Sequence, residues 1–116
     1  MWINPYSYQT YTLSAFLDYD VIEVSARVTR KHGITLNDVE RACENIIQYA
    51  KSWSDDYNMD IHAVAGNIYT SLDSTRQLQM LANLVWNDDG RAVFKVWHAL
   101  DLTEKMARKL KLRRMR

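Results

Sequence analysis

Residues that break regular secondary structure are scarce in this chain. Its 116 residues include only three glycines and one proline, which argues against a turn-rich sandwich or barrel and favours helices. The single cysteine, Cys43, excludes an intrachain disulfide framework and a cysteine-based zinc finger. No stretch approaches the roughly 18–20 consecutive apolar residues of a membrane span. We therefore expect a cytoplasmic protein with no membrane partner.

Charge is missing from the beginning of the chain. The first charged side chain is Asp18, and the uncharged segment before it is rich in aromatic residues. This segment also lacks the basic and long apolar regions of a secretory signal peptide. Aromatic side chains concentrate in cores and at contact surfaces, so we expect it to pack on the protein's own core or on a partner, including a second copy. The interface candidates are Trp2, Tyr6, Tyr8 and Tyr11.

Basic charge is concentrated at the other end of the chain. Seven of the 15 Lys and Arg residues fall in residues 104–116, where Glu104 is the only carboxylate. Seven cations against one carboxylate give this segment a net charge of +6, and the remaining eight cations against 13 carboxylates give the rest −5. Such asymmetry predicts a charged partner or a tail folded on its own acidic body. The predicted binding residues are Lys105, Arg108, Lys109, Lys111, Arg113, Arg114 and Arg116.

Apolar residues recur with helical spacing over most of the chain. This periodicity predicts an all-α fold, a single compact bundle of five to six helices with short loops over residues 1–116. The basic segment 103–116 is expected to supply the last helix and the tail. Polar breaks separate the expected helices, which lie at about 36–52, 61–72, 74–85, 93–100 and from Asp101 or Thr103 onward.

Residues 20–30 fit two structures. Their apolar and polar residues alternate as in a strand, but a helical stripe is present too. Three basic side chains precede Gly33, and cations followed by glycine are typical of a helix C-terminus. We therefore predict a helix here, with an N-terminal β-hairpin plus helices as the alternative fold. Thr35, followed three residues later by Asp38, predicts a capped start of the next helix.

Residues 25–39 resemble the middle of a helix-turn-helix DNA-binding motif. In this resemblance a helix ends at Gly33, Ile34 fills the turn and a capped helix turns Val39 inward. His32 stands where the motif has an apolar residue, and the second helix presents several carboxylates, which phosphates repel. A plain corner between two helices is the alternative.

No residue pattern predicts catalysis or a metal site. Residues 56–60 have the first ligand spacing of a calcium loop, but Ile61 and Asn67 stand where that loop requires glycine and a bidentate glutamate. The three histidines are far apart in sequence. Cys43 is expected to be a buried, apolar side chain with a raised thiol pKa. We therefore expect no enzyme, no cofactor and no metal.

These observations predict a small non-enzymatic binding or regulatory protein that docks on a macromolecule. The partner is expected to be a protein or a nucleoprotein, with nucleic acid as an option through the basic tail. An inhibitor of a host system, carried by a phage or mobile element, is one form that such a protein takes. The rival prediction is a DNA-binding regulator that uses the helix-turn-helix-like segment.

Overall fold

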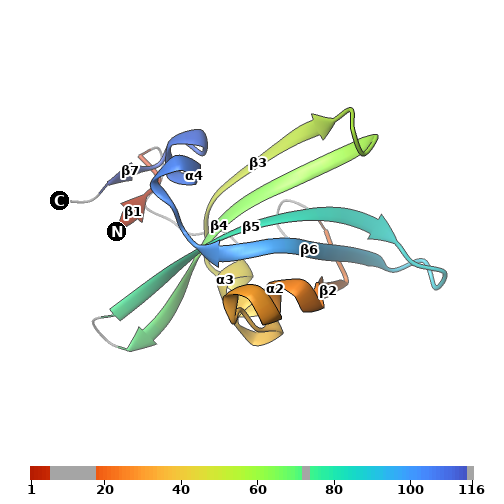
Figure 1. Ribbon diagram of the computed structural model, residues 1–116, viewed down its shortest axis with the longest axis horizontal. Helices are drawn as coiled ribbons and strands as arrows, with labels where there is room; N and C mark the ends of the chain where they lie inside the picture. Colours follow the sequence, from red (N-terminus) through yellow and green to blue (C-terminus); the bar gives the residue numbers. More distant parts are fainter. Residues whose placement is uncertain (6–17, 72–73, 115–116) are drawn as a thin grey trace.

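The computed structural model describes residues 1–5, 18–71 and 74–114, and strands dominate it. Five strands form one sheet in the order β2-β6-β5-β4-β3 (Figure 1). All neighbouring strands are antiparallel except β2 and β6, which run parallel. The bounds of these strands are Val21–Val24 (β2), Ile46–Ser54 (β3), Met59–Ser71 (β4), Ser74–Trp86 (β5) and Ala92–Asp101 (β6).

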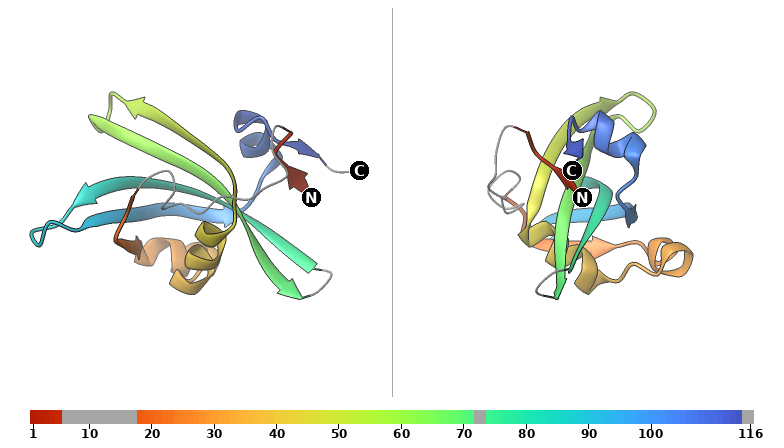
Figure 2. Two further views of the ribbon diagram at one scale, coloured as in Figure 1. Left: turned by 180° about the vertical axis from the view of Figure 1, so that it is seen from behind. Right: turned by 90° about the vertical axis from the view of Figure 1, so that its left-hand side faces the viewer.

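Three helices and a small second sheet complete the described structure. The helices are Ala26–His32 (α2), Leu36–Glu44 (α3) and Glu104–Lys109 (α4). The second sheet pairs Trp2–Ile3 (β1) with Arg113–Arg114 (β7) in antiparallel register, so the two ends of the described chain lie together. Figures 1 and 2 show α2 and α3 on one side of the large sheet and α4 on the other.

The prediction of an all-α helical bundle is wrong. The helices expected at 61–72, 74–85 and 93–100 correspond to β4, β5 and β6. Both faces of the sheet are covered, and in β4 the neighbours Val64 and Ala65 are both fully buried, one in each of two cores. Strands buried on both faces carry nearly continuous apolar runs instead of strict alternation. Such runs fit a helical stripe equally well, which explains the error.

The helix expected to run to Ser52 ends at Glu44 instead. From Ile46 onward the chain is β3, in which the β-branched Ile46 and Ile47 and the aromatic Tyr49 favour extended backbone. The sequence 20–30 divides into β2 followed by α2, so both the helix and the alternative β-hairpin are corrected. β2 pairs with β6 and not with its neighbour in sequence.

The corner between α2 and α3 is confirmed in detail. Gly33 ends α2 in the left-handed conformation, with φ of 67° and its N–H donating to the carbonyl oxygen of Thr29. Thr35 then caps α3: its Oγ1 accepts from Asp38 N at 3.2 Å, and Asp38 Oδ2 accepts from Thr35 N at 3.0 Å. Ile34 and Val39, which flank the cap, are both buried. Local capping chemistry therefore fixes this part of the fold.

The main core lies between the two N-terminal helices and the sheet. Phe94, Val96 and Met80 are buried in it together with Val28 and Val39 from the helices. A smaller core lies on the opposite face, where α4 and the residues after it cover β3 and β4. Its buried members are Ile47, Ala65, Ala107, Leu110 and Leu112.

The large sheet divides at one end. Pairing between β4 and β5 stops at His62 and Ala82, so the β3–β4 hairpin and the β5–β6 hairpin diverge beyond this point (Figures 1 and 2). Asn83 of β5 lies directly opposite Lys95 of β6, on the face of the sheet that carries Ala63. Asn83 is half-buried and Lys95 is exposed at this position.

Candidate functional site

The predicted basic tail is exposed on the surface. α4 begins after Thr103, and the apolar residues Met106 and Leu110 hold it on the sheet, as the sequence predicts. Among the described residues, a tail cation forms one ion pair, which joins Arg108 Nη2 to Glu104 Oε1 at 2.6 Å. The tail cations that the structure describes are all exposed: Lys105, Arg108, Lys109, Lys111, Arg113 and Arg114. Arg116 lies outside the described residues.

The predicted aromatic interface is only partly described. Trp2 lies in β1, half-buried, and packs against the smaller core. The guanidinium of Arg114 lies 5.8 Å from the centre of the Trp2 ring, in the geometry of a cation–π contact. Trp2 therefore packs against the protein's own core and contacts Arg114 of the tail. The candidates Tyr6, Tyr8 and Tyr11 lie outside the described residues.

A groove that the sequence analysis did not identify runs around Trp97 of β6. Three adjoining cavities of about 370, 310 and 200 Å³ all include this indole in their lining. Tyr57 and Asn83 line the first, Asn83 and Lys95 the second, and α2 the third. We call this surface the Trp97 groove; its aromatic and charged or polar residues are Glu23, Ser25, Arg27, Lys31, His32, Tyr57, Asn83, Lys95, Trp97 and His98.

Two aromatic side chains of this groove are open to solvent. Trp97 is 40% exposed and Tyr57 is 68% exposed. β6 bulges beside Trp97, because Val96 pairs with Ala82 and His98 pairs with Leu81, which leaves Trp97 as the extra residue. A bulge re-aims the side chain that it carries. A large indole presented in this way is a ready contact for a planar ligand.

Among the described lining residues of the groove, Arg27, Lys31 and Lys95 are cations and Glu23 is a carboxylate. Lys95 forms a long ion pair of 4.0 Å with Glu23 across β2 and β6. Arg27 and Lys31 lie on α2 and have no ion-pair partner among the described residues. They line the smallest cavity together with Val28, His32, Trp97 and His98; we call it the α2–β6 pocket. Burial, and then the neighbouring charges of His32 and Lys31, lower the pKa of His98.

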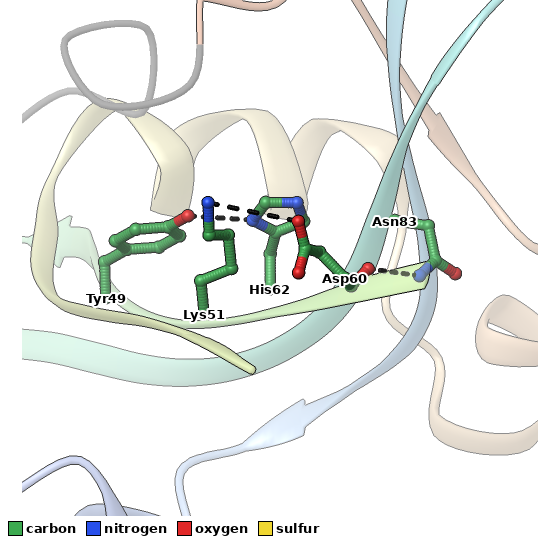
Figure 3. A network of polar contacts seen from close by, with 5 residues as sticks. All are labelled: Tyr49, Lys51, Asp60, His62 and Asn83. Atoms are coloured by element: carbon green, nitrogen blue, oxygen red, sulfur yellow. Dashed lines mark hydrogen bonds and ion pairs between the residues drawn. The ribbon is translucent and has the colours of Figure 1, made fainter. Parts of the chain in front are cut away.

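A network of polar contacts holds the divided end of the sheet, as Figure 3 shows. Asn83 Nδ2 donates to the carbonyl oxygen of Asp60 at 2.8 Å, which bridges β5 to β4 where their pairing has ended. On the β3–β4 hairpin, Tyr49 Oη and His62 Nδ1 lie 2.8 Å apart, and Lys51 Nζ lies 3.9 Å from Asp60 Oδ2. The wall of the Trp97 groove at Asn83 is therefore fixed in place.

His62 is a neutral member of this network at neutral pH. It is only 5% exposed, and this burial lowers its pKa; Lys51 acts in the same direction and Asp60 opposes it. Burial also raises the pKa of Tyr49, with a further contribution from Asp60. The pair is suited to packing and hydrogen bonding more than to proton transfer.

A separate cavity, larger than any one of the three cavities around Trp97, is lined by acidic residues. It measures about 440 Å³ and lies between β2 and α3. Asp20, Glu40 and Glu44 line it together with Tyr19 and Leu36. Carboxylates disfavour a phosphate-bearing ligand, so this cavity is unsuited to one. Glu40 and Glu44 are exposed on α3, the helix that corresponds to the recognition helix of a helix-turn-helix.

Cys43 is buried in the main core, as predicted. Burial, followed by the nearby Glu40 and Glu44, raises the pKa of its thiol to about 12, so the reactive thiolate is suppressed. Within residues 1–5, 18–71 and 74–114, no group of three or more His, Cys, Asp or Glu side chains is placed to hold a metal ion. None of the described helices is long and apolar enough to cross a membrane.

No known protein family matches the chain, and neither a curated protein nor a solved structure is significantly similar to it.

Proposed function

We propose that this protein binds single-stranded nucleic acid in the Trp97 groove. The observation that carries the proposal is that three adjoining cavities share the exposed Trp97 and are lined by Arg27, Lys31 and Lys95. Proteins that bind single strands combine a positively charged groove with aromatic side chains on which bases stack. Exposed aromatic residues also bind protein partners, but the added cations Arg27, Lys31 and Lys95 favour a polyanion.

A single strand fits this surface better than a duplex does. The faces of the bases are hidden inside a duplex and are accessible in a single strand. The exposed rings of Trp97 and Tyr57 can stack on bases. Arg27 and Lys31 of α2 line the cavity on the other side of Trp97, where they can pair with phosphates. The exposed basic tail, with Lys105 and Lys109 on α4, adds attraction that does not depend on sequence.

The proposal narrows the broader prediction of a protein that docks on a macromolecule. A non-enzymatic role, a cytoplasmic location, a homodimer and an inhibitory role of the phage or mobile-element kind stay predictions. The rival prediction of a helix-turn-helix regulator gains no support from α3, because Glu40 and Glu44 are exposed on it and would face phosphates.

The test is fluorescence anisotropy with labelled single strands of RNA and DNA of about ten nucleotides, within the size range that one small domain covers. We expect Trp97→Ala to weaken binding by about 1–3 kcal/mol, the usual contribution of one stacked base. The matched control is Trp86→Ala, because Trp86 is 70% exposed at the end of β5 and does not line the groove.

Three results would contradict the proposal. One is equal loss of affinity in the two tryptophan variants. Another is equal binding of a duplex of the same sequence. The third is affinity that does not change with salt, since each phosphate contact on a single strand should contribute a slope of about 0.7. Thermal melting of each variant shows whether the fold is retained.

A further inference from the structure

Gln79 is a buried polar residue in contact with His98, which lines the α2–β6 pocket. It lies in β5 and is only 5% exposed. Its Oε1 accepts hydrogen bonds from both Thr103 N, at 2.8 Å, and Thr103 Oγ1, at 2.9 Å. Its Nε2 lies 3.0 Å from Nε2 of His98. The side chain thus connects the N-cap residue of α4 to a residue that lines the pocket.

These contacts determine which nitrogen of His98 carries the proton. A backbone N–H can only donate, so the amide oxygen of Gln79 must face Thr103 and its NH2 group must face His98. An NH2 group can only donate as well, so Nε2 of His98 must accept. A neutral imidazole that accepts at Nε2 carries its proton on Nδ1. Nδ1–H is therefore the second polar atom of the ring, and no hydrogen bond joins it to another residue in the part of the chain that the structure describes.

The lining of the pocket selects the kind of ligand. Arg27 and Lys31 supply fixed positive charge, and His32, Trp97 and His98 complete the polar and aromatic part. No carboxylate occurs among the described lining residues. The volume of about 200 Å³ is below the usual range of roughly 300–1,000 Å³ for pockets that hold a whole small molecule. The pocket is suited to one small anionic group next to an indole ring.

We propose that the α2–β6 pocket binds a phosphate group, held by the charges of Arg27 and Lys31 and by the Nδ1–H of His98, with Gln79 as the positioning residue that presents this N–H. The inference rests on the proposed function, because the phosphate that the pocket binds belongs to the backbone of a nucleic-acid strand whose base stacks on Trp97. The same chemistry would admit a free phosphate or a mononucleotide.

The first measurement is the position of the proton on His98. Nitrogen-15 spectra of the histidine rings in the full-length protein distinguish the two neutral tautomers, and we expect Nδ1–H. Gln79→Glu has nearly the same shape and keeps an acceptor for Thr103, but its other oxygen can only accept from His98. We expect the proton to move to Nε2 in this variant. An Nε2–H tautomer in the unaltered protein would overturn the role of Gln79.

The second measurement is a titration with inorganic phosphate, followed through the ring signals of His98 and the indole signal of Trp97. Lys31→Gln should weaken phosphate binding about tenfold, the usual effect of one charge-assisted hydrogen bond. Arg30→Gln is the matched control, because Arg30 lies beside Lys31 on α2, is exposed, and does not line the pocket. Equal effects of the two substitutions, or no response of His98 to phosphate, would overturn the proposal.

Competition separates this proposal from the proposed function. Displacement of phosphate from His98 by an oligonucleotide supports both. Phosphate binding that depends on Lys31, together with no binding of the oligonucleotide in the anisotropy assay, keeps the pocket as a site for free phosphate or a mononucleotide and contradicts the proposed function. Oligonucleotide binding that depends on Trp97 but is equal in the Lys31→Gln and Arg30→Gln variants contradicts the pocket and leaves the proposed function standing.

Discussion

Of the three glycines, Gly66 is the one at which an added methyl group would clash with neighbouring atoms. A Cβ atom at this position would lie 2.2 Å from the carbonyl oxygen of Ala42 and 2.8 Å from its carbonyl carbon. Both are backbone atoms of α3 where it crosses β4, so no side chain can rotate away to make room. The close approach of this helix to the sheet therefore requires glycine.

We predict that Gly66→Ala lowers the free energy of unfolding by about 3 kcal/mol, the upper part of the usual range for overpacking a core. Gly33→Ala is the control. Nothing lies within 4 Å of a Cβ at Gly33, so only its φ of 67° opposes alanine, at a cost of about 1 kcal/mol. Urea denaturation measures both, and equal costs would show that the contact between α3 and β4 is looser than described.

His62 gives the folded protein a pH dependence whose sign follows from its lowered pKa. In the unfolded chain a histidine takes up a proton near pH 6.5, whereas the buried His62 resists protonation. Below about pH 6.5 the unfolded state therefore binds more protons, and the free energy of unfolding falls as the pH falls. One such group contributes at most about 1.4 kcal/mol per pH unit. His98 acts in the same direction.

We expect His62→Phe to reduce the slope of unfolding free energy against pH between about pH 6.5 and the lowered pKa. The slope that remains comes in part from His98. Asn37→Ala serves as the control, because it removes no titratable group from an exposed position and should leave the slope unchanged. A series of urea titrations at several pH values measures the slopes. Identical slopes for the unaltered protein and His62→Phe would contradict the buried, neutral state of His62.

At the scale of elements, the sequence predicts what is determined locally. The end of α2 at Gly33 and the start of α3 at Thr35 follow from capping chemistry that acts within four residues. Two of the predicted polar breaks are turns, at residues 55–58 and 88–89, although they connect strands and not helices. The N-cap at Thr103 is one of the two residues, with Asp101, at which the sequence predicts the start of the last helix.

The strands could not be predicted in the same way, because their identity depends on what covers each face. β4 contributes to a core on each face, and in β5 the neighbours Leu78, Gln79 and Met80 are all buried. Such burial removes the alternation that marks a strand. The candidate site also depends on contacts between elements that are distant in sequence. Asn83 and Lys95 meet only because β5 pairs with β6, whereas the basic tail is continuous in sequence and was predicted.

The cap of α3 provides a prediction for a single element. Thr35→Ala removes the acceptor for Asp38 N and should lower the free energy of unfolding by about 0.5–2 kcal/mol. Asn37→Ala, in the same turn, should be neutral or slightly stabilising, since alanine is the better helix former. Urea denaturation compares the two variants. A Thr35→Ala variant as stable as Asn37→Ala would show that the capping box contributes nothing.

For the whole molecule, the arrangement of charge matters more than its total. The net charge is only +1, yet the acidic cavity between β2 and α3 and the basic Trp97 groove are distinct surfaces. The tail adds six described cations, of which only Arg108 is in an ion pair with another described residue. Such a molecule attracts a polyanion to one part of its surface, and salt weakens this attraction.

Reversing tail charge should reduce nucleic-acid binding without affecting the fold. Lys105→Glu combined with Lys109→Glu should lower affinity and reduce the salt slope by up to about 1.4, which is 0.7 for each lost phosphate contact on a single strand. The same two positions changed to Gln should give a smaller loss. Anisotropy at several salt concentrations measures both, and an unchanged slope would show that the tail does not touch the strand.

The most direct test of the central claim is to map a bound strand on the protein by NMR, following each backbone amide while a short single-stranded oligonucleotide is added. We predict the largest shifts at residues 95–98 of β6, at residues 27–32 of α2 and at Tyr57, with smaller shifts along the tail. Shifts confined to the tail, or centred on the acidic cavity between β2 and α3, would contradict a nucleic-acid site in the Trp97 groove.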